Sequence, residues 1–440
     1  MPTRVIEVEL TAPLPRLDHD GHYGRAWILV RLYTEPIGVC VVTLPREGID
    51  PDALAALVWA QLNGAVAERF AAAGLTAPAA LAGSGLVGLE ADPDGWPFLR
   101  RRAAALADAP FISVVVCTRD RPDQIKQCLS RLAKQKYPRY EVVVVDNAPT
   151  SDALLKVVEG QVAEGPAGAG AKFRYCVEPR PGLSWARNAG IAAATSDIIA
   201  FLDDDEEPDE HWLAGVADGF ARGERVGCVS GIVLPARLDN AIENLFEQIG
   251  GHSKGRGFVK ETFTKSGPQS PLWPLPPFGV GANMAFRREA LDRIGGFDVA
   301  LGAGTQTGGG EDTLAITLVL LCGYEVAYEP VALMWHYHRQ DMVSLNKQLH
   351  GYSVGLTAFY AALLRQRPSA LLGLLGLLPL AVSYLRGGEG EPDDDEAAGD
   401  PQELAAELDR RALQGMLKGP VLYAKSRRAQ RRTAAAARRK

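Results

Sequence analysis

Three consecutive carboxylates, Asp203, Asp204 and Asp205, directly follow the apolar run Ile198–Leu202. Carboxylates packed this closely repel one another unless a cation or hydrogen-bond donors neutralise them. Mg²⁺ or Mn²⁺ suits such a cluster, because either ion binds one or two carboxylates and completes its shell with substrate phosphates and water. The alternative is a solvated acidic loop that continues through Glu210. The position directly after an apolar strand favours a divalent ion with a diphosphate ligand.

A second acidic pair, Glu311 and Asp312, follows the flexible run Gly308–Gly310 and begins an apolar helix. A carboxylate here could act as a general base, although Asp312 could also simply cap the helix. Further along, His336 and His338 follow a strand-like stretch, and alternation along a strand places both rings on one face. Either histidine could bind the ion or form an ordinary hydrogen bond, and we favour His336 as the ligand.

Four short apolar runs, rich in β-branched residues, must position these groups. They span residues 111–118, 141–145, 173–177 and 198–202, and helical patterns separate them. This alternation predicts an α/β fold with a mostly parallel sheet and right-handed crossovers. Open α/β sheets bind ligands beyond the carboxyl ends of their strands. Thr118, Asp146 and Asp203 all lie at such ends, so we expect them to converge on one site.

From Phe111 to about Arg365 the sequence resembles the family 2 glycosyltransferases, which have the GT-A fold and use nucleotide-sugar donors. Seven ordered segments carry the resemblance: Ile112–Pro122, Glu141–Asn147, Gly182–Gly190, Ile199–Asp205, Gly281–Arg287, Gly295–Asp298 and Gly310–Asp312. It implies a GT-A, Rossmann-like sheet flanked by helices. The FLDDD segment matches the family's DxD motif, which is shared between the donor and its metal ion.

The resemblance also implies roles for individual residues. Residues matching donor-binding positions are Thr118, Arg119, Asp146, Arg187, Asn188, Asp203 and Asp204, with Asp146 accepting a hydrogen bond from a pyrimidine ring. Asp205 matches the metal ligand of the DxD motif, and His336 the histidine that often completes the metal's shell. Asp312 matches the catalytic base of an inverting transfer, with Glu311 as second choice. Many relatives carry another acid two positions after the base, where this chain has Leu314.

The rest of the chain predicts three further regions around a GT-A domain at residues 110–345. Residues 1–109 predict a small α+β domain of unknown role, in which His19 and His22 could bind a metal but are more typical of a polar turn. Residues 346–386 predict a helical extension whose uncharged stretch 369–385 is an interfacial anchor or part of the core. Residues 387–440 predict an acidic linker and a basic tail that attracts anionic lipid or stays solvated.

Composition limits the class of protein. The chain has 440 residues, of which 47% are hydrophobic and 23% charged, which is typical of a globular protein. Its net charge of −6 argues against nucleic acid as a partner. The six cysteines form no C-x-x-C pair, and the first residues do not read as a secretory signal. We therefore expect a cytoplasmic protein that can associate peripherally with the inner face of the membrane.

The resemblance and the residues together predict a metal-dependent, inverting glycosyltransferase. The donor would be a UDP-, dTDP- or GDP-sugar, and the acceptor a glycan, a lipid-linked sugar or a small molecule. Such a protein would take part in the glycosylation of cell-surface polysaccharides, glycolipids or natural products. One alternative is a sugar-1-phosphate nucleotidyltransferase, although Thr118–Pro122 lacks the glycine-rich phosphate loop that such an enzyme needs. Another is a catalytically silent protein that only binds a nucleotide sugar or acts as a scaffold.

Overall fold

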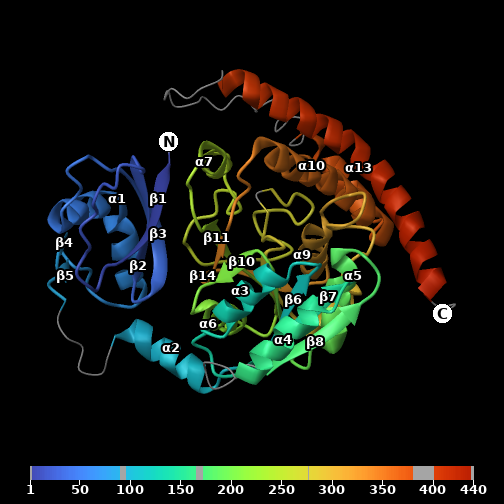
Figure 1. The fold of residues 1–440 in the computed structure, drawn as a ribbon, viewed down its shortest axis with the longest axis horizontal. Helices are drawn as coiled ribbons and strands as arrows, with labels where there is room; N and C mark the ends of the chain where they lie inside the picture. The colour runs from blue at the N-terminus through green and yellow to red at the C-terminus, as the bar shows by residue number, and fades with distance from the viewer. Residues whose placement is uncertain (1, 90–95, 165–171, 276, 380–400, 438–440) are drawn as a thin grey trace.

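The computed structural model of the protein describes residues 2–89, 96–164, 172–275, 277–379 and 401–437. A large mixed sheet forms its centre, a smaller N-terminal module lies on one side, and a long C-terminal helix curves along the other (Figure 1). The expected α/β class, with an N-terminal α+β module and a helical C-terminal extension, is confirmed.

The N-terminal module is a three-stranded sheet covered by one long helix. Its elements are β1 (Thr3–Glu9), β2 (Arg25–Leu32), β3 (Glu35–Thr43), α1 (Pro51–Ala72), β4 (Ala80–Ala82) and β5 (Gly85–Val87), and helix α2 (Pro97–Ala107) follows. The Asp50 side chain accepts hydrogen bonds from the first turn of α1, which explains where that helix begins. His19 and His22 lie in a turn held by local hydrogen bonds, with His19 Nδ1 accepting from Gly21.

The central sheet has nine strands, eight of them in the order β10-β14-β11-β13-β9-β6-β7-β8, while β12 pairs with β14. The strands are β6 (Ile112–Thr118), β7 (Tyr140–Asn147), β8 (Lys172–Glu178), β9 (Ile198–Asp203), β10 (Glu206–Pro208), β11 (Val226–Pro235), β12 (Glu261–Phe263), β13 (Asn283–Arg287) and β14 (Glu325–His336). The four strands from β9 to β8 pair in parallel, as the sequence predicts. The other half is mixed, because β13 runs antiparallel to both β9 and β11.

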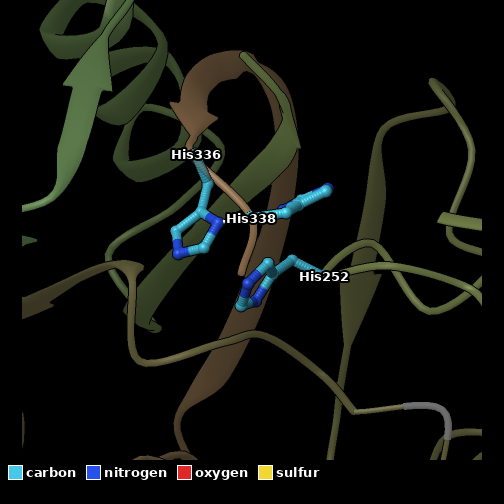
Figure 2. A group of neighbouring side chains, drawn as sticks. All are labelled: His252, His336 and His338. Atoms are coloured by element: carbon cyan, nitrogen blue, oxygen red, sulfur yellow. Dashed lines mark hydrogen bonds between the residues drawn. The ribbon is translucent and has the colours of Figure 1, made fainter. Parts of the chain in front are cut away.

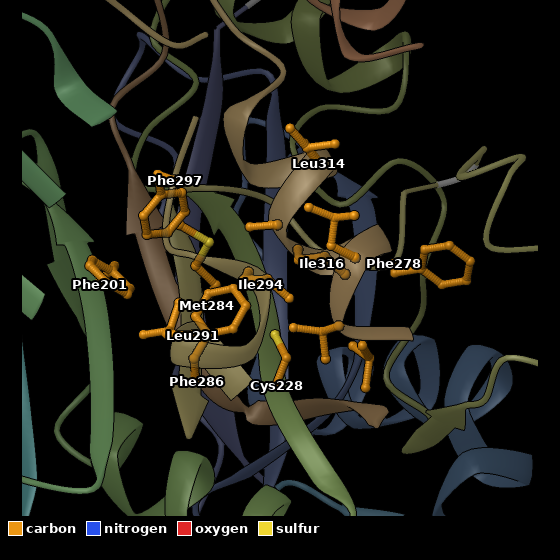
Figure 3. Close-up of a cluster of buried hydrophobic side chains, with 14 of the residues drawn as sticks. Phe201, Cys228, Phe278, Met284, Phe286, Leu291, Ile294, Phe297, Leu314 and Ile316 are labelled. Carbon is orange, nitrogen blue, oxygen red and sulfur yellow. The ribbon is translucent and has the colours of Figure 1, made fainter. Parts of the chain in front are cut away.

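Helices cover both faces of this sheet. They are α3 (Pro122–Leu132), α4 (Ala153–Glu164), α5 (Leu183–Ala193), α6 (Trp212–Phe220), α7 (Ala241–Gln248), α8 (Arg288–Ile294) and α9 (Glu311–Leu321). In β6, Val114 and Val116 pack in the core that contains α3, α4 and α6, whereas Val115 and Cys117 pack in the core that contains α5, α8 and α9. Figure 3 shows part of the second core. Burial on both faces explains why these strands are continuously apolar.

The described part of the C-terminal extension contains α10 (Met342–Gln366), α11 (Ala370–Gly376) and α13 (Pro401–Ala437). Residues 401–437, which the sequence predicts as the end of a linker and a tail, therefore form one helix, and it packs along α10 (Figure 1). Of the apolar stretch 369–385, residues 380–385 lie outside the described residues. No helix in the described ranges combines the length and the apolar composition needed to cross a bilayer.

The N-terminal module contacts the central domain through apolar side chains such as Trp27 and Leu29, through main chain and through charge. Thr3 pairs with Leu238 by an antiparallel bridge, and its hydroxyl donates a hydrogen bond to Asn244. The buried Arg31 guanidinium lies 2.6 Å from an Asp209 oxygen, just after β10, and 2.5 Å from Glu7 of its own module. This ion pair connects the module to the segment that follows the three aspartates.

Candidate functional site

A cavity of about 1120 Å³ opens beyond the carboxyl ends of β6 and β9. Nine of the eleven residues predicted for the site line it: Thr118, Arg119, Arg187, Asp203, Asp204, Asp205, Glu311, Asp312 and His336. Thr118 and His336, at the two ends of this set, are 218 positions apart in sequence, so the fold brings them together. The cavity is large enough for a nucleotide with an attached group.

Asp204 is the most firmly held of the three aspartates. Its side chain is buried, the Thr118 hydroxyl donates to it at 2.6 Å, and the Arg121 guanidinium donates at 2.9 Å. These contacts use both carboxylate oxygens, so Asp204 positions the loop. Arg121, which the sequence analysis missed, stands in the same Thr118–Pro122 segment that predicts nucleotide contacts.

Asp205 has weaker partners and faces the cavity. One of its oxygens lies 3.6 Å from Arg339 and 4.0 Å from Arg121, and both guanidinium groups are partly exposed. Asp205 is thus the aspartate best placed to exchange an arginine contact for a metal ion. Arg339, which follows the histidines of β14, was also missed, because a single arginine in a loop gives no signal in the sequence.

Arg187 connects the two acidic groups of the site. It projects from α5, is only 2% exposed, and lies 3.3 Å from an Asp203 oxygen and 2.8 Å from a Glu311 oxygen. The same guanidinium donates to the Gly281 carbonyl at 3.1 Å. Arg187 is therefore a buried cation that orients two carboxylates from distant segments of the chain toward one site.

Asp312 is held beside the same guanidinium but does not cap its helix. The residue at the N-cap is Gly310, with φ of 88°, a conformation that favours glycine. One Asp312 oxygen accepts the Gly281 N–H at 2.7 Å, and the other accepts the N–H of Thr313 at 2.7 Å. Asp312 is half-buried and faces the cavity. Its carboxylate is thus oriented by two backbone donors.

Acidic side chains outnumber Arg and Lys side chains on the wall of this cavity. Burial and the neighbouring aspartates raise the pKa of Asp203 to about 6, although Arg187 opposes the shift. Burial and Asp312 raise the pKa of Glu311 to about 7 in the same way. Both oxygens of the buried Glu206 lack a hydrogen-bond partner among the described residues, and burial raises its pKa well above the usual value. Excess carboxylate beside a cavity is a donor set that fits Mg²⁺ or Mn²⁺.

The raised pKa of Glu311 predicts a measurable pH dependence of stability. Between about pH 4.5 and pH 7 the folded protein, free of divalent ions, keeps a proton on Glu311 that the unfolded chain releases. The free energy of unfolding should therefore decrease as pH rises through this window, by up to about 3 kcal/mol from this group. Glu311→Gln should flatten the dependence in denaturant titrations. Glu289→Gln, an exposed control on α8, should not, and equal slopes for both variants would contradict the assignment.

Two predicted residues do not line the cavity. Asp146, at the end of β7, is fully buried, and Tyr175 donates to one of its oxygens at 2.7 Å while the other lacks a partner among the described residues. Asn188 uses its side-chain amide on the main chain of Phe297, donating at 2.9 Å and accepting at 2.9 Å. In this structure the Asn188 side chain therefore holds the turn after α8, and its contact with a donor stays a prediction.

His336 faces the cavity, and His338 does not line it. The two rings nevertheless share one side, as alternation predicts, with their Nδ1 atoms 3.1 Å apart. Burial lowers the pKa of His336 to about 4, so the ring is neutral near pH 7, which is the form that binds metal ions. A third ring, His252, was missed, because it comes from a loop more than 80 positions earlier in the chain.

This chain is similar to known glycosyltransferases over part of its length. The family model described as glycosyl transferase family 2 matches residues 113–295. A glucosyl-dolichyl phosphate glucuronosyltransferase from Haloferax volcanii is 24% identical over 43% of this chain and 57% of its own length. The succinoglycan biosynthesis protein ExoM from Rhizobium meliloti is 31% identical over 50% of this chain and 65% of its own length.

Among solved structures, a mannosyltransferase from Pyrobaculum calidifontis in complex with GDP-Man and Mn²⁺ is 21% identical, with a TM-score of 0.47 over 73% of this chain and 93% of that one. The chain spans less than two thirds of the length of each of the two curated relatives named above. The matched region of residues 113–295 contains β6, β7, β9 and the three aspartates at the cavity. The part of this chain that is similar to glycosyl transferase family 2 is therefore the part that carries the aspartates of the cavity.

Proposed function

We propose that the protein transfers a sugar from a nucleotide-sugar donor to an acceptor hydroxyl, with inversion and with the help of a divalent ion. One observation carries the proposal. Arg187, buried in α5, contacts both Asp203 after β9 and Glu311 at the start of α9, and so places the donor-side and base-side carboxylates on one cavity. A sugar held between them would have an acid group on each side.

The donor's diphosphate is proposed to lie near the aspartates, where Arg119, Arg121 and Arg339 supply positive charge. Asp205 would hold Mg²⁺ or Mn²⁺, which would neutralise the leaving diphosphate when bound, and Asp203 would contact the ribose side of the donor. His336, the second predicted ligand of this ion, lies among two other histidines. The proposed contact of Asp146 with the nucleotide base would use its unpartnered oxygen, and it requires the buried side chain to become accessible from the cavity when the donor binds. Because the Thr118 hydroxyl already binds Asp204, we assign Thr118 to holding the loop of the three aspartates and not to contacting the nucleotide base.

Inversion needs a carboxylate that takes the proton from the acceptor hydroxyl as its oxygen attacks the anomeric carbon. We assign this role to Asp312, because two backbone N–H groups orient its carboxylate and it faces the cavity. Glu311 is the second choice, since it is buried and paired with Arg187. Relatives named for glycolipid and polysaccharide synthesis support a glycan or a lipid-linked acceptor for this chain.

A donor screen tests the proposal. UDP-, dTDP- and GDP-sugars are incubated with the full-length protein, with and without Mn²⁺, and release of nucleoside diphosphate is measured. Metal-dependent release from one class of donor is expected. Binding without turnover for every donor and acceptor would instead favour the silent scaffold. Release of pyrophosphate from a nucleoside triphosphate and a sugar-1-phosphate would favour the nucleotidyltransferase.

We further propose that the protein binds the surface of anionic membranes through its C-terminal extension. Exposed leucines project from α11 and the residues just after it: Leu371, Leu372, Leu375 and Leu378. Leu372 is 78% exposed, which is costly for a large apolar side chain in water. Exposed basic residues of α13, among them Arg428, Arg431 and Arg432, supply charge that anionic lipids attract.

The membrane proposal predicts sedimentation of the protein with phosphatidylglycerol vesicles at low salt. The double substitution Leu372→Ser and Leu375→Ser should weaken membrane binding, since each leucine buried in the membrane contributes about 1.5–3 kcal/mol to the free energy of binding. Replacing Arg428, Arg431 and Arg432 by Gln should weaken it by about 1 kcal/mol per residue. Leu57→Ser, at an exposed leucine of α1, is the control. Equal sedimentation of all variants would remove the proposal.

Point substitutions are preferable to removing residues 366–440. Arg365 of α10 donates to the Tyr423 hydroxyl of α13 at 2.8 Å, and Met416 of α13 lines the cavity. Further along α13, Gln430 accepts a hydrogen bond from Trp185 of α5 at 2.7 Å. Because α5 also carries Arg187, truncation would alter the site together with the membrane contact.

A further inference from the structure

Three histidine side chains meet beside the cavity. His336 is the last residue of β14, His338 follows two positions later, and His252 comes from the loop after α7 (Figure 2). One nitrogen from each ring lies within 4.8 Å of the others. The closest pair is His336 Nδ1 and His338 Nδ1, which are 3.1 Å apart.

The hydrogen-bond partners of these rings determine which nitrogens are free. His338 Nε2 lies 2.7 Å from an oxygen of Glu247, and a carboxylate can only accept, so Nε2 carries the hydrogen. In this tautomer the lone pair of Nδ1 points toward His336. His252 Nε2 is buried and has no hydrogen-bond partner among the described residues. A carboxylate behind a histidine is the arrangement that fixes metal-binding rings in their ligand tautomer.

The surroundings also resemble a metal site more than ordinary packing. The Phe246 ring centroid lies 5.2 Å from that of His252 and 4.8 Å from that of His338, so an apolar group shields the cluster on one side. On the other side, His252 and His336 line the cavity. A buried nitrogen without a partner is costly, and a bound cation would remove that cost.

We propose that His252, His336 and His338 form a three-imidazole site for a transition-metal ion of the Zn²⁺ or Co²⁺ type. Such ions prefer imidazole, whereas Mg²⁺ and Mn²⁺ prefer the carboxylates around Asp205. With metal–nitrogen distances of about 2.0–2.1 Å, tetrahedral ligand atoms lie roughly 3.3 Å apart. The Nδ1 pair nearly has this spacing, and His252 needs only a small side-chain movement to join it.

The open side of the cluster gives the ion a fourth position. Three protein ligands with one position left for water or another ligand is the pattern of reactive zinc sites, while structural sites use four protein ligands. Here that position faces the cavity, because two of the three rings line it. The ion would thus add a positive charge to the cavity wall close to Glu206, whose position in β10 pairs with His336.

Metal titration of the full-length protein tests the site without any assay of transfer. After removal of metals, Co²⁺ is added and the visible spectrum recorded, and Zn²⁺ binding is measured by calorimetry. One Zn²⁺ per chain and an intense Co²⁺ spectrum of low coordination number, displaced by Zn²⁺, are expected. His252→Gln and His338→Gln should each lower the Zn²⁺ affinity by more than the about 10–100-fold expected for Glu247→Gln.

The matched control is His350→Gln, because His350 also lines the cavity but lies outside the cluster. It should leave the Zn²⁺ affinity and the Co²⁺ spectrum unchanged. Thermal unfolding of each variant identifies any that misfold, and His252→Gln, in a partly exposed loop, serves if His338→Gln does not fold. Absence of stoichiometric Zn²⁺ binding, or equal affinity in His252→Gln and His350→Gln, would overturn the proposal. Asp205→Asn should keep Zn²⁺ binding, which separates this site from the proposed donor site.

Discussion

Asp312→Asn is expected to lower kcat by about 10²–10⁴-fold, the usual contribution of a general base, while donor affinity changes little. The substituted amide cannot accept the proton of the acceptor hydroxyl. It also has only one acceptor atom, whereas Asp312 accepts N–H groups from both Gly281 and Thr313. Some loss of stability is therefore expected as well, and thermal unfolding must accompany the kinetics.

Glu311→Gln is the matched control for this prediction, because it makes the same chemical change one residue earlier. Glu311 is buried against Arg187, so its replacement should alter the pH dependence of stability more than kcat. Near wild-type turnover in Asp312→Asn, with a large loss in Glu311→Gln, would move the role of base to Glu311. Comparable small losses in both variants would show that neither acts as the base.

Asp205→Asn is expected to abolish the Mn²⁺-dependent part of nucleoside diphosphate binding. Asp205 makes only long contacts to Arg121 and Arg339, so the substitution removes a metal ligand without breaking a close ion pair. The affinity measured by calorimetry in Mn²⁺ should fall by more than the roughly 10–100-fold typical of groups that only support a ligand. An unchanged affinity would contradict the metal assignment.

Asp204→Asn provides the contrast for Asp205→Asn. Asp204 is buried and uses its oxygens on Thr118 and Arg121, so asparagine there should lower thermal stability and leave the Mn²⁺ dependence in place. The two substitutions are chemically identical and adjacent in the chain. A difference between them can therefore be assigned to position, and a shared loss of metal dependence would mean that the loop as a whole, rather than Asp205, is required.

The parallel half of the sheet could be predicted because its strands are locally encoded. The run 141–145 is almost wholly valine, and the structure has β7 there, extended to Tyr140–Asn147. Residues at the ends of such strands converge by topology alone, which is why the sequence could place Thr118 and Asp203 at one cavity. The short strand β10 could not be predicted, because its Glu206-Glu-Pro208 sequence is polar and its pairing with β14 depends on residues far along the chain.

The partners of the site residues depend on tertiary packing and had little signal in the sequence. Asn188 stands next to Arg187, but successive residues on a helix point in different directions, and only Arg187 faces the carboxylates. His252 comes from a loop whose sequence has no helix or strand periodicity, so its position next to His336 and His338 could not be predicted. The helix Pro401–Ala437 was missed as an element, because its acidic beginning and basic end suggested solvated chain.

The acidic segment after β9 is fixed at both of its ends. Asp203 contacts Arg187 at one end, and at the other Asp209 receives the Arg31 guanidinium at 2.6 Å and a hydrogen bond from Gln135 to its carbonyl. Ordering the backbone of a free residue costs about 1–2 kcal/mol, and a ligand that must order a loop loses affinity by that amount per residue. Here the loss is avoided, because β10 is already in place. Arg31 belongs to the N-terminal module, which lies outside the matched region of residues 113–295. That module therefore helps to keep the acidic segment ordered, and so lowers the entropic cost for a ligand that binds there.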